Sequence, residues 1–415
     1  MQSYRAETDG SDGLPPLVLH VIHRLGVGGL ENGVVNLVNR MPAHRYRHAI
    51  ACMTEAGEFQ KRIQRPDVRV HSLRKQDGKG VGALSRLFRL IWRLRPAIVH
   101  TRNLATLEGQ VCAALAGVPG RIHGEQGRDT TDLYGTRRKY VVLRRALRPC
   151  VNHYIAVSAD LADWLVRIVG VNANHVSQIY NGVDTLRFTA RAEREGPPEV
   201  PGFGEQDAFV VGSVSRMHPV KDPLTLARAF ILFVQANPAA RKRARLLLVG
   251  DGPVLPDVRN VLTAAGVQDL VWMPGERSDV AHLLRMMHLF VLPSVAEGTS
   301  NTILEAMATG LPVIATAVGG NLELVEPDRT GLLVPPADPV RMAEAITLYF
   351  NDPDRAGRCG SAARSRVERL FSLESMIDHS LQVYDSVLTA NRRFMPSLGA
   401  RGKKMHPGVK ATTRK

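Results

Sequence analysis

The sequence predicts an α/β protein with two domains, each built on a doubly wound parallel sheet. Three observations predict this fold class. The chain has 415 residues, which is long for a single hydrophobic core. Short apolar runs alternate with helical patterns in both halves, as they do where helices cover both faces of a parallel sheet. A segment rich in Glu, Pro and Gly, residues 191–206, separates the two series and is expected to be a linker.

The first domain is predicted to span residues 14–190. A glycine turn and a helix over about residues 31–39 follow its first strand. Arg95-Pro96 ends a later helix and introduces the next strand, because proline cannot continue a helix. The strands expected in this domain cover residues 17–22, 48–53, 68–72, 97–101, 154–158 and 176–180.

The second domain is predicted to span residues 207–371. Its apolar runs show little polar alternation, which is typical of parallel strands buried on both faces. We therefore expect a second parallel sheet. Its strands are expected to cover residues 209–214, 245–250, 270–273, 289–292, 313–315 and 331–334.

The composition narrows the class of protein. The apolar share of 44% and the charged share of 22% are those of an ordinary globular chain. No run approaches 18 apolar residues, and residues 1–13 lack the apolar core of a signal peptide, so we expect a cytoplasmic protein. The four cysteines lack the spacing of a disulfide framework or a zinc site and fit a reducing compartment. They are Cys52, Cys112, Cys150 and Cys359.

The net charge of +15 is concentrated in three segments. Arginines interleave with apolar residues over residues 86–95, and basic residues decorate a second helix over residues 137–148. The tail, residues 390–415, is basic and is expected to be disordered. Such surfaces attract anionic membranes, but a generic basic surface explains the charge equally well. Nucleic acid is not an expected partner, because no zinc finger, helix-turn-helix or aromatic-studded basic strand accompanies the charge.

The most informative segment for function joins a strand, a polar turn and a helix. Residues 289–292 read as a buried strand, residues 298–301 as a turn and residues 302–309 as a helix. The free N–H groups at the start of a helix suit an anionic phosphate. Glu297 lies just before this helix and Glu305 lies within its first turns. The two acids could therefore contact groups on both sides of a diphosphate.

These two acids, with Ala306-Met307-Ala308 behind them, resemble the donor site of the retaining glycosyltransferase family 4. The resemblance implies the GT-B fold, in which two Rossmann-like domains face a central cleft. It also implies that Glu305 binds the ribose hydroxyls of a nucleotide and that Glu297 binds the donor sugar. The backbone N–H groups that would line the sugar and the phosphates belong to Gly298, Thr299, Ser300, Asn301, Thr302 and Ile303.

Arg216 and Lys221 are the cations expected to hold the donor diphosphate. They follow a strand and precede a helix, which places them at the C-terminal edge of the second sheet. The pair is similar to the Arg and Lys with which the family grips the diphosphate. Because cations can balance the leaving-group charge, we expect neither a metal ion nor another cofactor. The triplet Asp352-Pro353-Asp354 lies far from the donor motif and is not expected to bind a metal.

The turn over residues 25–31 only half matches the dinucleotide fingerprint Gly-x-Gly-x-x-Gly. Glu31 stands where the third glycine would be, so NAD binding is not expected. The turn resembles the Gly-Gly loop of the family, whose backbone reaches across the cleft toward the donor phosphate. This resemblance implies that Gly28 and Gly29 contact the donor, where a side chain would prevent close approach.

Further landmarks extend the resemblance over most of the chain. Arg277 and Val280 would border the base, and Glu323 would lie near the donor edge. These segments most resemble transferases from bacterial exopolysaccharide loci, including those associated with PEP-CTERM sorting systems. The last helix, residues 372–389, would cross back onto the first domain.

The family often carries a histidine near the reacting carbon, after a strand of the first domain. In this chain either His123 or Gln126 holds that position, and the sequence does not decide between them. A histidine within a strand more often packs in the core than takes part in catalysis. His123 is therefore an open candidate for catalysis.

We predict a retaining, metal-independent glycosyltransferase that moves a sugar from a UDP- or GDP-linked donor to a glycan or lipid-linked acceptor. Its expected setting is exopolysaccharide biosynthesis, in the cytoplasm or on the inner face of the cell membrane. The main alternative is a GT-B-type epimerase, which would convert a UDP-sugar with no acceptor present. A sugar phosphorylase of similar shape would need a lysine-bound pyridoxal. A basic membrane- or nucleic-acid-binding module would bind lipid or polynucleotide but no nucleotide sugar.

Overall fold

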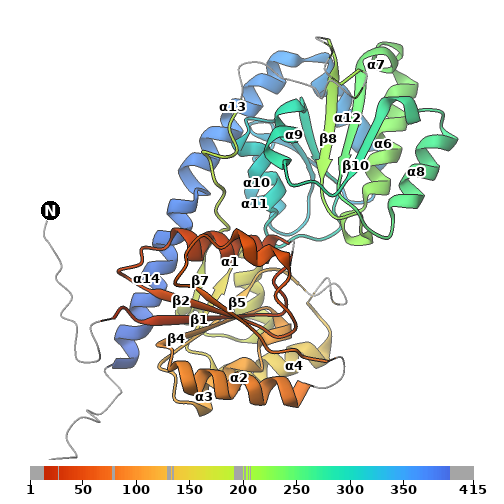
Figure 1. The fold of residues 1–415 in the computed structure, drawn as a ribbon. Coiled ribbons are helices and arrows are strands. Elements are labelled where there is room, and N and C mark those ends of the chain that lie inside the picture. The colour runs from red at the N-terminus through yellow and green to blue at the C-terminus, as the bar shows by residue number, and fades with distance from the viewer. Residues whose placement is uncertain are drawn as a thin grey trace, which may run out of the picture.

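The computed structural model describes residues 14–392 except residues 27, 77–79, 129–131, 133–134, 191–199, 201, 204 and 206. Within these ranges the chain forms two parallel sheets, one of seven and one of six strands. Figure 1 shows each sheet with its own helices, the first half of the chain below the second. The predicted fold class is therefore confirmed. Most of the expected linker and residues 393–415 of the expected tail lie outside the described residues.

The sheet of the N-terminal domain has the strand order β3-β2-β1-β4-β5-β6-β7. Neighbouring strands pair in parallel. The chain order reverses between β1 and β4, which opens a crevice at the C-terminal edge of the sheet. The strands are β1 (Leu17–Ile22), β2 (Arg47–Cys52), β3 (Arg69–Ser72), β4 (Ile98–Arg102), β5 (Gly120–Glu125), β6 (His153–Ala156) and β7 (Val176–Gln178).

Helices cover both faces of this sheet. On one face, α1 buries Val34 and Val38 against Ile22. On the opposite face, α2 buries Leu87 against Leu19. Figure 1 shows α1 on the side nearest the C-terminal domain and α2, α3 and α4 on the far side. The helices are α1 (Gly29–Arg40), α2 (Gly80–Leu94), α3 (Gly109–Leu115), α4 (Arg138–Leu147) and α5 (Ala159–Trp164).

The sheet of the C-terminal domain has the order β10-β9-β8-β11-β12-β13, again with parallel pairing. Its strands are fully apolar in the middle, as predicted for strands buried on both faces. They are β8 (Phe209–Val214), β9 (Ala244–Val249), β10 (Val271–Gly275), β11 (Leu289–Leu292), β12 (Val313–Thr316) and β13 (Gly331–Val334).

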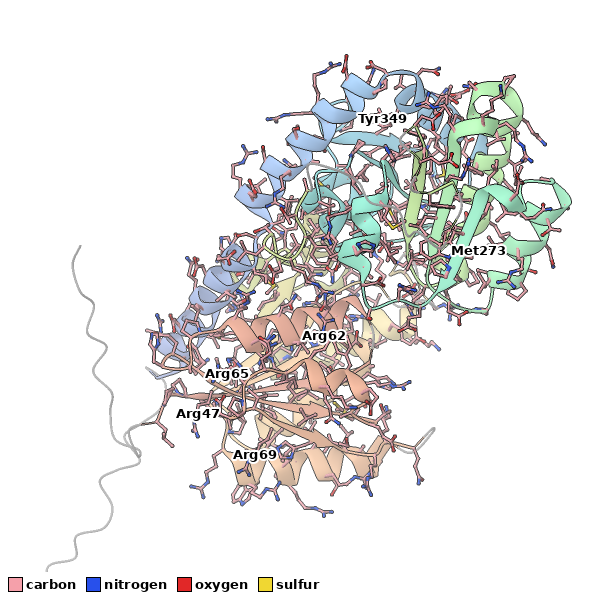
Figure 2. The ribbon with its side chains drawn as sticks, turned by 45° about the horizontal axis from the view of Figure 1, so that its top comes forward. Arg47, Arg62, Arg65, Arg69, Met273 and Tyr349 are labelled. Carbon is pink, nitrogen blue, oxygen red and sulfur yellow. The ribbon has the colours of Figure 1, made fainter. Side chains whose placement is uncertain are left out.

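Eight helices follow these strands in the described part of the C-terminal domain. Phe230, Phe233 and Tyr349 form the aromatic centre of one of its cores, and Figure 2 labels Tyr349 among the helices. The helices are α6 (Pro223–Ala236), α7 (Pro238–Arg243), α8 (Leu255–Ala264), α9 (Val280–Met286), α10 (Asn301–Ala308), α11 (Asn321–Leu324), α12 (Pro339–Asn351) and α13 (Pro353–Leu370).

The last helix, α14 (Leu373–Arg392), returns to the N-terminal domain. Its residues Met376 and Tyr384 share a core with Val18 of β1 and Ile98 of β4. The Tyr384 hydroxyl lies 2.9 Å from Nδ1 of His100. The N-terminal domain is thus built from both ends of the described chain.

Strand ends differ from the prediction where side chains begin a helix. The strand predicted over residues 154–158 ends at Ala156, because Ser158 instead caps α5 by accepting a hydrogen bond from the N–H of Leu161. The predicted last helix, residues 372–389, continues to Arg392. An apolar pattern alone does not mark the residue at which the backbone hydrogen bonds change partner.

Candidate functional site

The candidate site lies where α10 of the C-terminal domain meets the β1–α1 turn of the N-terminal domain. Ser300 caps α10, and its Oγ accepts a hydrogen bond from the N–H of Ile303 at 3.3 Å. Just before this cap, the backbone of Gly298 packs on the other domain. A Cβ at Gly298 would lie 2.5 Å from the carbonyl oxygen of Gln126, so only glycine permits this contact.

A lysine and a glutamate meet beside the start of α10. Nζ of Lys221, at the end of a short helix after β8, is 2.5 Å from Oε1 of Glu297. The same oxygen accepts a hydrogen bond from the Ser294 hydroxyl at 2.6 Å. The side chains of Lys221 and Glu297 are only 19% and 7% exposed, so water screens their attraction poorly. A diphosphate could replace Glu297 as the partner of this lysine.

Arg216 lies on the same loop as Lys221 and is exposed. It attracts the carboxylate of Glu31, in the first turn of α1, across the domain boundary. Burial raises the pKa of Glu31, and the attraction to Arg216 opposes this shift. Glu31 is therefore a site residue that the sequence showed only as a departure from the dinucleotide fingerprint.

The glycine turn joins the site through main-chain contacts. The carbonyl oxygen of Gly29 accepts a hydrogen bond from Nδ2 of Asn301 at 3.0 Å. Oδ1 of Asn301 in turn accepts one from Nδ2 of Asn181 at 2.9 Å. A Cβ at Gly29 would crowd the Asn301 amide, and a Cβ at Gly28 would collide with the Glu31 carboxylate. Both glycines thus lie beside the start of α10, where the sequence places donor phosphates.

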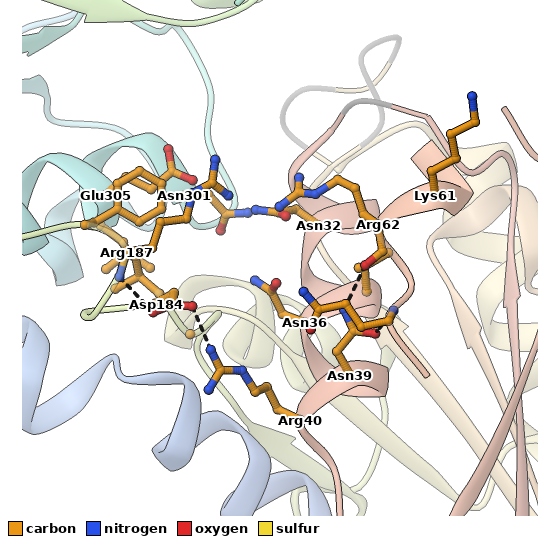
Figure 3. Close-up of a pocket in the computed structure, with 16 residues that line it drawn as sticks. Asn32, Asn36, Asn39, Arg40, Lys61, Arg62, Asp184, Arg187, Asn301 and Glu305 are labelled. Carbon is orange, nitrogen blue, oxygen red and sulfur yellow. Dashed lines mark hydrogen bonds and ion pairs between the residues drawn. The ribbon is translucent and has the colours of Figure 1, made fainter. Parts of the chain in front are cut away.

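Glu305 lies one turn further along α10 and lines a pocket of about 300 Å³ between the domains. Figure 3 shows this pocket, with Arg187 beside Glu305 and Arg62 entering from the other domain. Burial raises the pKa of Glu305 to about 7, against the attraction of Arg187 and Arg62. The predicted acids Glu297 and Glu305 therefore have different surroundings: one is paired with a lysine, and the other faces an open pocket.

The structure buries His123 in the middle of β5, away from this pocket. The ring is 0% exposed. Its Nδ1 lies 2.8 Å from the Thr101 hydroxyl and its Nε2 lies 3.4 Å from Glu125. In this position the ring does not reach a substrate, so the geometry does not support the suggested catalytic role. Gln126 instead follows the strand end and lies against Gly298.

Four other candidates have contacts or positions of their own. Thr299 donates its hydroxyl proton to the carbonyl oxygen of Val157 at 2.5 Å. Arg277 forms a two-pronged ion pair with Asp279, at 2.9 and 2.8 Å, and Val280 begins α9. The carboxylate of Glu323, predicted to lie near the donor edge, accepts hydrogen bonds from the N–H groups of Ala159 and Asp160 at the start of α5.

Four further site residues were not predicted from the sequence. Ser294 lies three positions before Glu297, so its closeness in sequence to this candidate could have indicated a place in the site. No local pattern distinguishes the other three, which reach the site only through the packing of the domains. They are Asn181, Arg62 and Arg187.

The arrangement can bind an elongated anion. Lys221, Arg216 and the start of α10 supply positive charge and free N–H groups, while Glu297 and Glu305 supply acceptors for hydroxyl groups. Within the described ranges, no cluster of His, Cys, Asp and Glu side chains has the arrangement of a metal site. Asp352 of the rejected Asp-Pro-Asp triplet caps α13.

Two protein-family models match this chain, one in each half. Residues 27–187 match the model described as Glycosyltransferase Family 4, and residues 208–352 match the model described as Glycosyl transferases group 1. The first match contains the glycine turn, and the second contains Arg216, Lys221 and both acids of α10. The first match covers most of the N-terminal domain, and the second covers most of the C-terminal domain.

Curated relatives include enzymes of three kinds. The chain is 28% identical over 311 residues to an Escherichia coli UDP-Gal:alpha-D-GlcNAc-diphosphoundecaprenol alpha-1,3-galactosyltransferase, covering 74% of this chain and 79% of that one. It is 31% identical to a Streptomyces coelicolor D-inositol 3-phosphate glycosyltransferase, over 58% of this chain and 56% of the relative, so it spans little more than half of that enzyme. It is 28% identical to a Bacillus anthracis N-acetyl-alpha-D-glucosaminyl L-malate synthase, covering 67% and 72%.

Solved structures share the whole fold. The Anabaena protein HepE in complex with UDP and glucose superposes with a TM-score of 0.75 at 20% identity, over 89% of this chain and 99% of that one. A sucrose-phosphate synthase from Thermosynechococcus elongatus has a TM-score of 0.75 at 22% identity, over 91% and 100%. Of the helices in the described ranges, none has the length and apolar character needed to cross a bilayer. The two-domain architecture, the matched family models and the curated relatives together show that this chain is a glycosyltransferase with the GT-B fold, similar in its N-terminal half to Glycosyltransferase Family 4.

Proposed function

We propose that this enzyme transfers a hexose from a UDP-sugar to a lipid-linked glycan, with retention of configuration and without a metal ion, in the assembly of a cell-surface polysaccharide. The convergence of Lys221, Glu297 and the start of α10 carries the donor assignment. The E. coli relative uses a UDP-sugar and a diphosphoundecaprenol-linked acceptor by its name, which supports the choice of UDP and of a lipid-linked acceptor.

In the proposed reaction, the bond between the anomeric carbon and the diphosphate oxygen breaks while the acceptor oxygen bonds to the same face of that carbon. The acceptor proton passes to the departing diphosphate oxygen. Lys221 and Arg216 balance the growing charge on this oxygen, together with the N–H groups of α10. Glu297 then releases Lys221, accepts hydrogen bonds from the hydroxyl groups of the sugar and so orients the sugar ring.

The direct test measures UDP release and glycan formation with a panel of UDP- and GDP-sugars and a prenyl-diphosphate-linked sugar. Arg216→Ala and Lys221→Ala should each lower kcat by about 100-fold or more, because a missing transition-state charge partner costs about that much. Lys242→Ala on α7, exposed and remote from the site, should turn over normally. NMR of the product should show the anomeric configuration of the donor.

Near-normal turnover of both site variants would refute the assigned roles. Conversion of the UDP-sugar to an epimer without acceptor would favour the epimerase alternative. Loss of activity on chelation of divalent cations would contradict a metal-independent reaction. An inverted product would contradict retention.

We also propose that the face formed by α2 and α4 docks on anionic lipid at the inner side of the cell membrane. Neither helix contains an acidic residue. Trp92 and Val81 of α2 are 62% and 83% exposed, and Val142 of α4 is 53% exposed. Exposed apolar groups among arginines are typical of helices that lie in a membrane interface. Figure 1 places both helices on the side of the sheet away from α1.

Flotation with phosphatidylcholine vesicles, with and without phosphatidylglycerol, tests this surface. The enzyme should float only with the anionic vesicles. Trp92→Ser and the triple change of Arg86, Arg89 and Arg93 to Gln should each weaken this association, whereas Val340→Ser on α12 should leave it unchanged. If all variants float equally well, this face does not bind the membrane, and its charge is that of a generic basic surface.

A further inference from the structure

Asn103, directly after β4, has a backbone conformation that favours glycine. Its φ and ψ are 58° and 169°. Asparagine tolerates the left-handed helical region, in which ψ is about 47°, but the ψ of Asn103 lies well outside that region. A strained backbone of this kind persists only where surrounding contacts hold it, and it is concentrated at functional sites. The contacts of Asn103 therefore indicate what this conformation provides.

The side chain of Asn103 binds the turn that follows the neighbouring strand. Its Oδ1 accepts a hydrogen bond from the N–H of Gln126 at 2.7 Å. The N–H of Asn103 donates to the carbonyl oxygen of Gly124 at 2.8 Å, which extends the pairing of β4 with β5 by one residue. Asn103 thus joins the C-terminal ends of two adjacent strands, at the edge of the sheet where ligands of this fold class bind.

A purely local role does not explain this side chain. Asn103 precedes a short 3-10 helix, residues 104–106, in the position where asparagine often caps a helix. Its side chain makes no cap to this helix, because the N–H of Thr106 donates to the backbone carbonyl of Asn103 instead. Glycine would adopt the backbone conformation without strain. What asparagine adds is its amide oxygen, and that oxygen binds Gln126.

The residue before this turn is fixed by other contacts. The buried carboxylate of Glu125 accepts hydrogen bonds from Nε and Nη2 of Arg144 at 2.7 and 3.2 Å. The backbone carbonyl of Glu125 accepts one from the N–H of Val157 on the β6 side. The bond from Gln126 to Asn103 extends this fixed region by one residue, into the turn.

The turn that Asn103 holds is a surface on which the donor loop packs. A Cβ at Gly298 would lie 2.5 Å from the carbonyl oxygen of Gln126 and 3.0 Å from Cα of Gly127. The two backbones are therefore in direct contact. Gly298 directly follows Glu297 and precedes the cap of α10, so a displaced turn would also displace the start of this helix.

We propose that Asn103 is a positioning residue for sugar transfer: its amide oxygen holds the Gln126–Gly127 turn in the place where the backbone of Gly298 packs on it. This inference rests on the proposed function, because it takes the N–H groups at the start of α10 as ligands of the donor phosphates. Asn103 acts through the turn and does not touch the donor. The charge on the departing diphosphate is greatest in the transition state, so a misplaced helix start lowers kcat more than donor binding.

Two substitutions of Asn103 separate its side chain from its backbone. Glycine keeps the conformation and removes the acceptor, whereas aspartate keeps an oxygen acceptor and also tolerates positive φ. Asn103→Gly should lower kcat about tenfold, the effect of one hydrogen bond, and change the Kd of UDP by less than about threefold. Asn103→Asp should retain most of the kcat. Ala337→Gly relieves another positive φ, at an exposed position before α12, and should leave kcat unchanged.

Amide hydrogen exchange measures the contact itself. The peptide that contains Gln126 should exchange faster in Asn103→Gly than in the unaltered chain, because its N–H loses an acceptor. The same peptide should exchange at the ordinary rate in Asn103→Asp. Unchanged exchange in α12 of every variant shows that the C-terminal domain is folded as before.

The outcomes separate the inference from the function on which it rests. If Asn103→Gly turns over as fast as the unaltered enzyme, Asn103 does not position the reaction. If Asn103→Asp is as slow as Asn103→Gly, the residue does not act by accepting the N–H of Gln126. If the Kd of UDP rises as much as kcat falls, Asn103 serves donor binding and the positioning role is wrong. If the unaltered chain neither binds UDP nor transfers a sugar, the proposed function itself falls, and the positioning role falls with it.

Discussion

At the scale of single residues, two glutamates of one motif differ because of what surrounds them. Glu297 is held by Lys221 and Ser294 at 2.5 and 2.6 Å. Glu305 faces a pocket, and burial raises its pKa to about 7. The Glu297 carboxylate can therefore release Lys221 and bind a sugar hydroxyl. The Glu305 carboxylate changes its charge near neutral pH. Both side chains are glutamates, so only their surroundings distinguish their roles.

The raised pKa of Glu305 predicts that donor binding depends on pH. An ionised carboxylate accepts hydrogen bonds from ribose hydroxyls, and a protonated one accepts them less well. The affinity for UDP should thus increase between pH 6 and pH 8. Glu305→Gln should bind UDP several-fold more weakly at pH 8 and should lack this component of the pH dependence. Calorimetric titrations at pH 6, 7 and 8 measure both, with Glu344→Gln on the exposed face of α12 as control.

The raised pKa of Glu305 also makes the stability of the folded chain depend on pH. The folded-state pKa of about 7 exceeds the ordinary value of 4.5, so the folded chain binds the extra proton between these values. The free energy of unfolding should therefore fall as pH rises from 4.5 through 7, by up to roughly 3 kcal/mol for this group. Thermal unfolding of Glu305→Gln should show a smaller decrease over this range. Identical pH profiles for the two proteins would contradict the shifted pKa.

At the scale of elements, α11 of one domain caps α5 of the other. The Glu323 carboxylate accepts hydrogen bonds from the N–H groups of Ala159 at 2.8 Å and Asp160 at 3.2 Å. It also accepts one from the Tyr180 hydroxyl at 2.9 Å. The first N–H groups of a helix lack partners within the helix, and their partial positive charge favours a carboxylate. Glu323 therefore links the two domains in the arrangement that the structure shows.

Removing this contact should favour an open arrangement. Glu323→Ala should weaken the domain contact by about 1–2 kcal/mol, the usual value of a helix cap, and raise the KM for the donor. Tyr180→Phe removes one of the three hydrogen bonds and should have a smaller effect. Small-angle scattering should show a larger radius of gyration for Glu323→Ala without ligand. If scattering and KM match those of the unaltered enzyme, the contact does not control closure.

At the scale of the whole molecule, the N-terminal domain depends on a helix from the other end of the chain. Tyr384 of α14 is 0% exposed, and its ring packs edge-on against Tyr46 and His100. Its neighbours on α14 complete the core under β1 and β4. The chain therefore crosses between the two domains twice, once after β7 and once at the start of α14.

Truncating this side chain should destabilise the N-terminal domain. Tyr384→Ala should lower the free energy of unfolding by about 3–5 kcal/mol, as for other large buried aromatic residues. Tyr384→Phe keeps the packing and loses the hydroxyl contacts to His100 and Arg102, so about 1–2 kcal/mol is expected. Urea unfolding followed by fluorescence measures both. Equal midpoints for Tyr384→Ala and the unaltered chain would show that α14 adds little to this domain.

The sequence by itself determined most of the strands and the class of enzyme, although strand β5 (Gly120–Glu125) was not among the expected strands. Strand β8 (Phe209–Val214) and strand β1 (Leu17–Ile22) begin and end where their apolar runs do. The start of α10 was predicted within one residue, because Ser300 and the polar turn are local signals. The nucleotide-sugar donor was implied by the resemblance of the segments with Glu297, Glu305, Arg216 and Lys221 to a glycosyltransferase family.

Only the tertiary structure decided which distant segments meet. Asn32 and Arg62 reach Glu305 across more than 200 positions of sequence, and Glu323 reaches α5 across more than 150. Burial of His123 depends on neighbours from β4 and on Glu125, which a strand pattern does not reveal. Local pattern fixes backbone conformation through hydrogen bonding and sterics of neighbouring residues. Contacts between domains depend on how whole sheets and helices pack, and no single stretch of sequence contains that information.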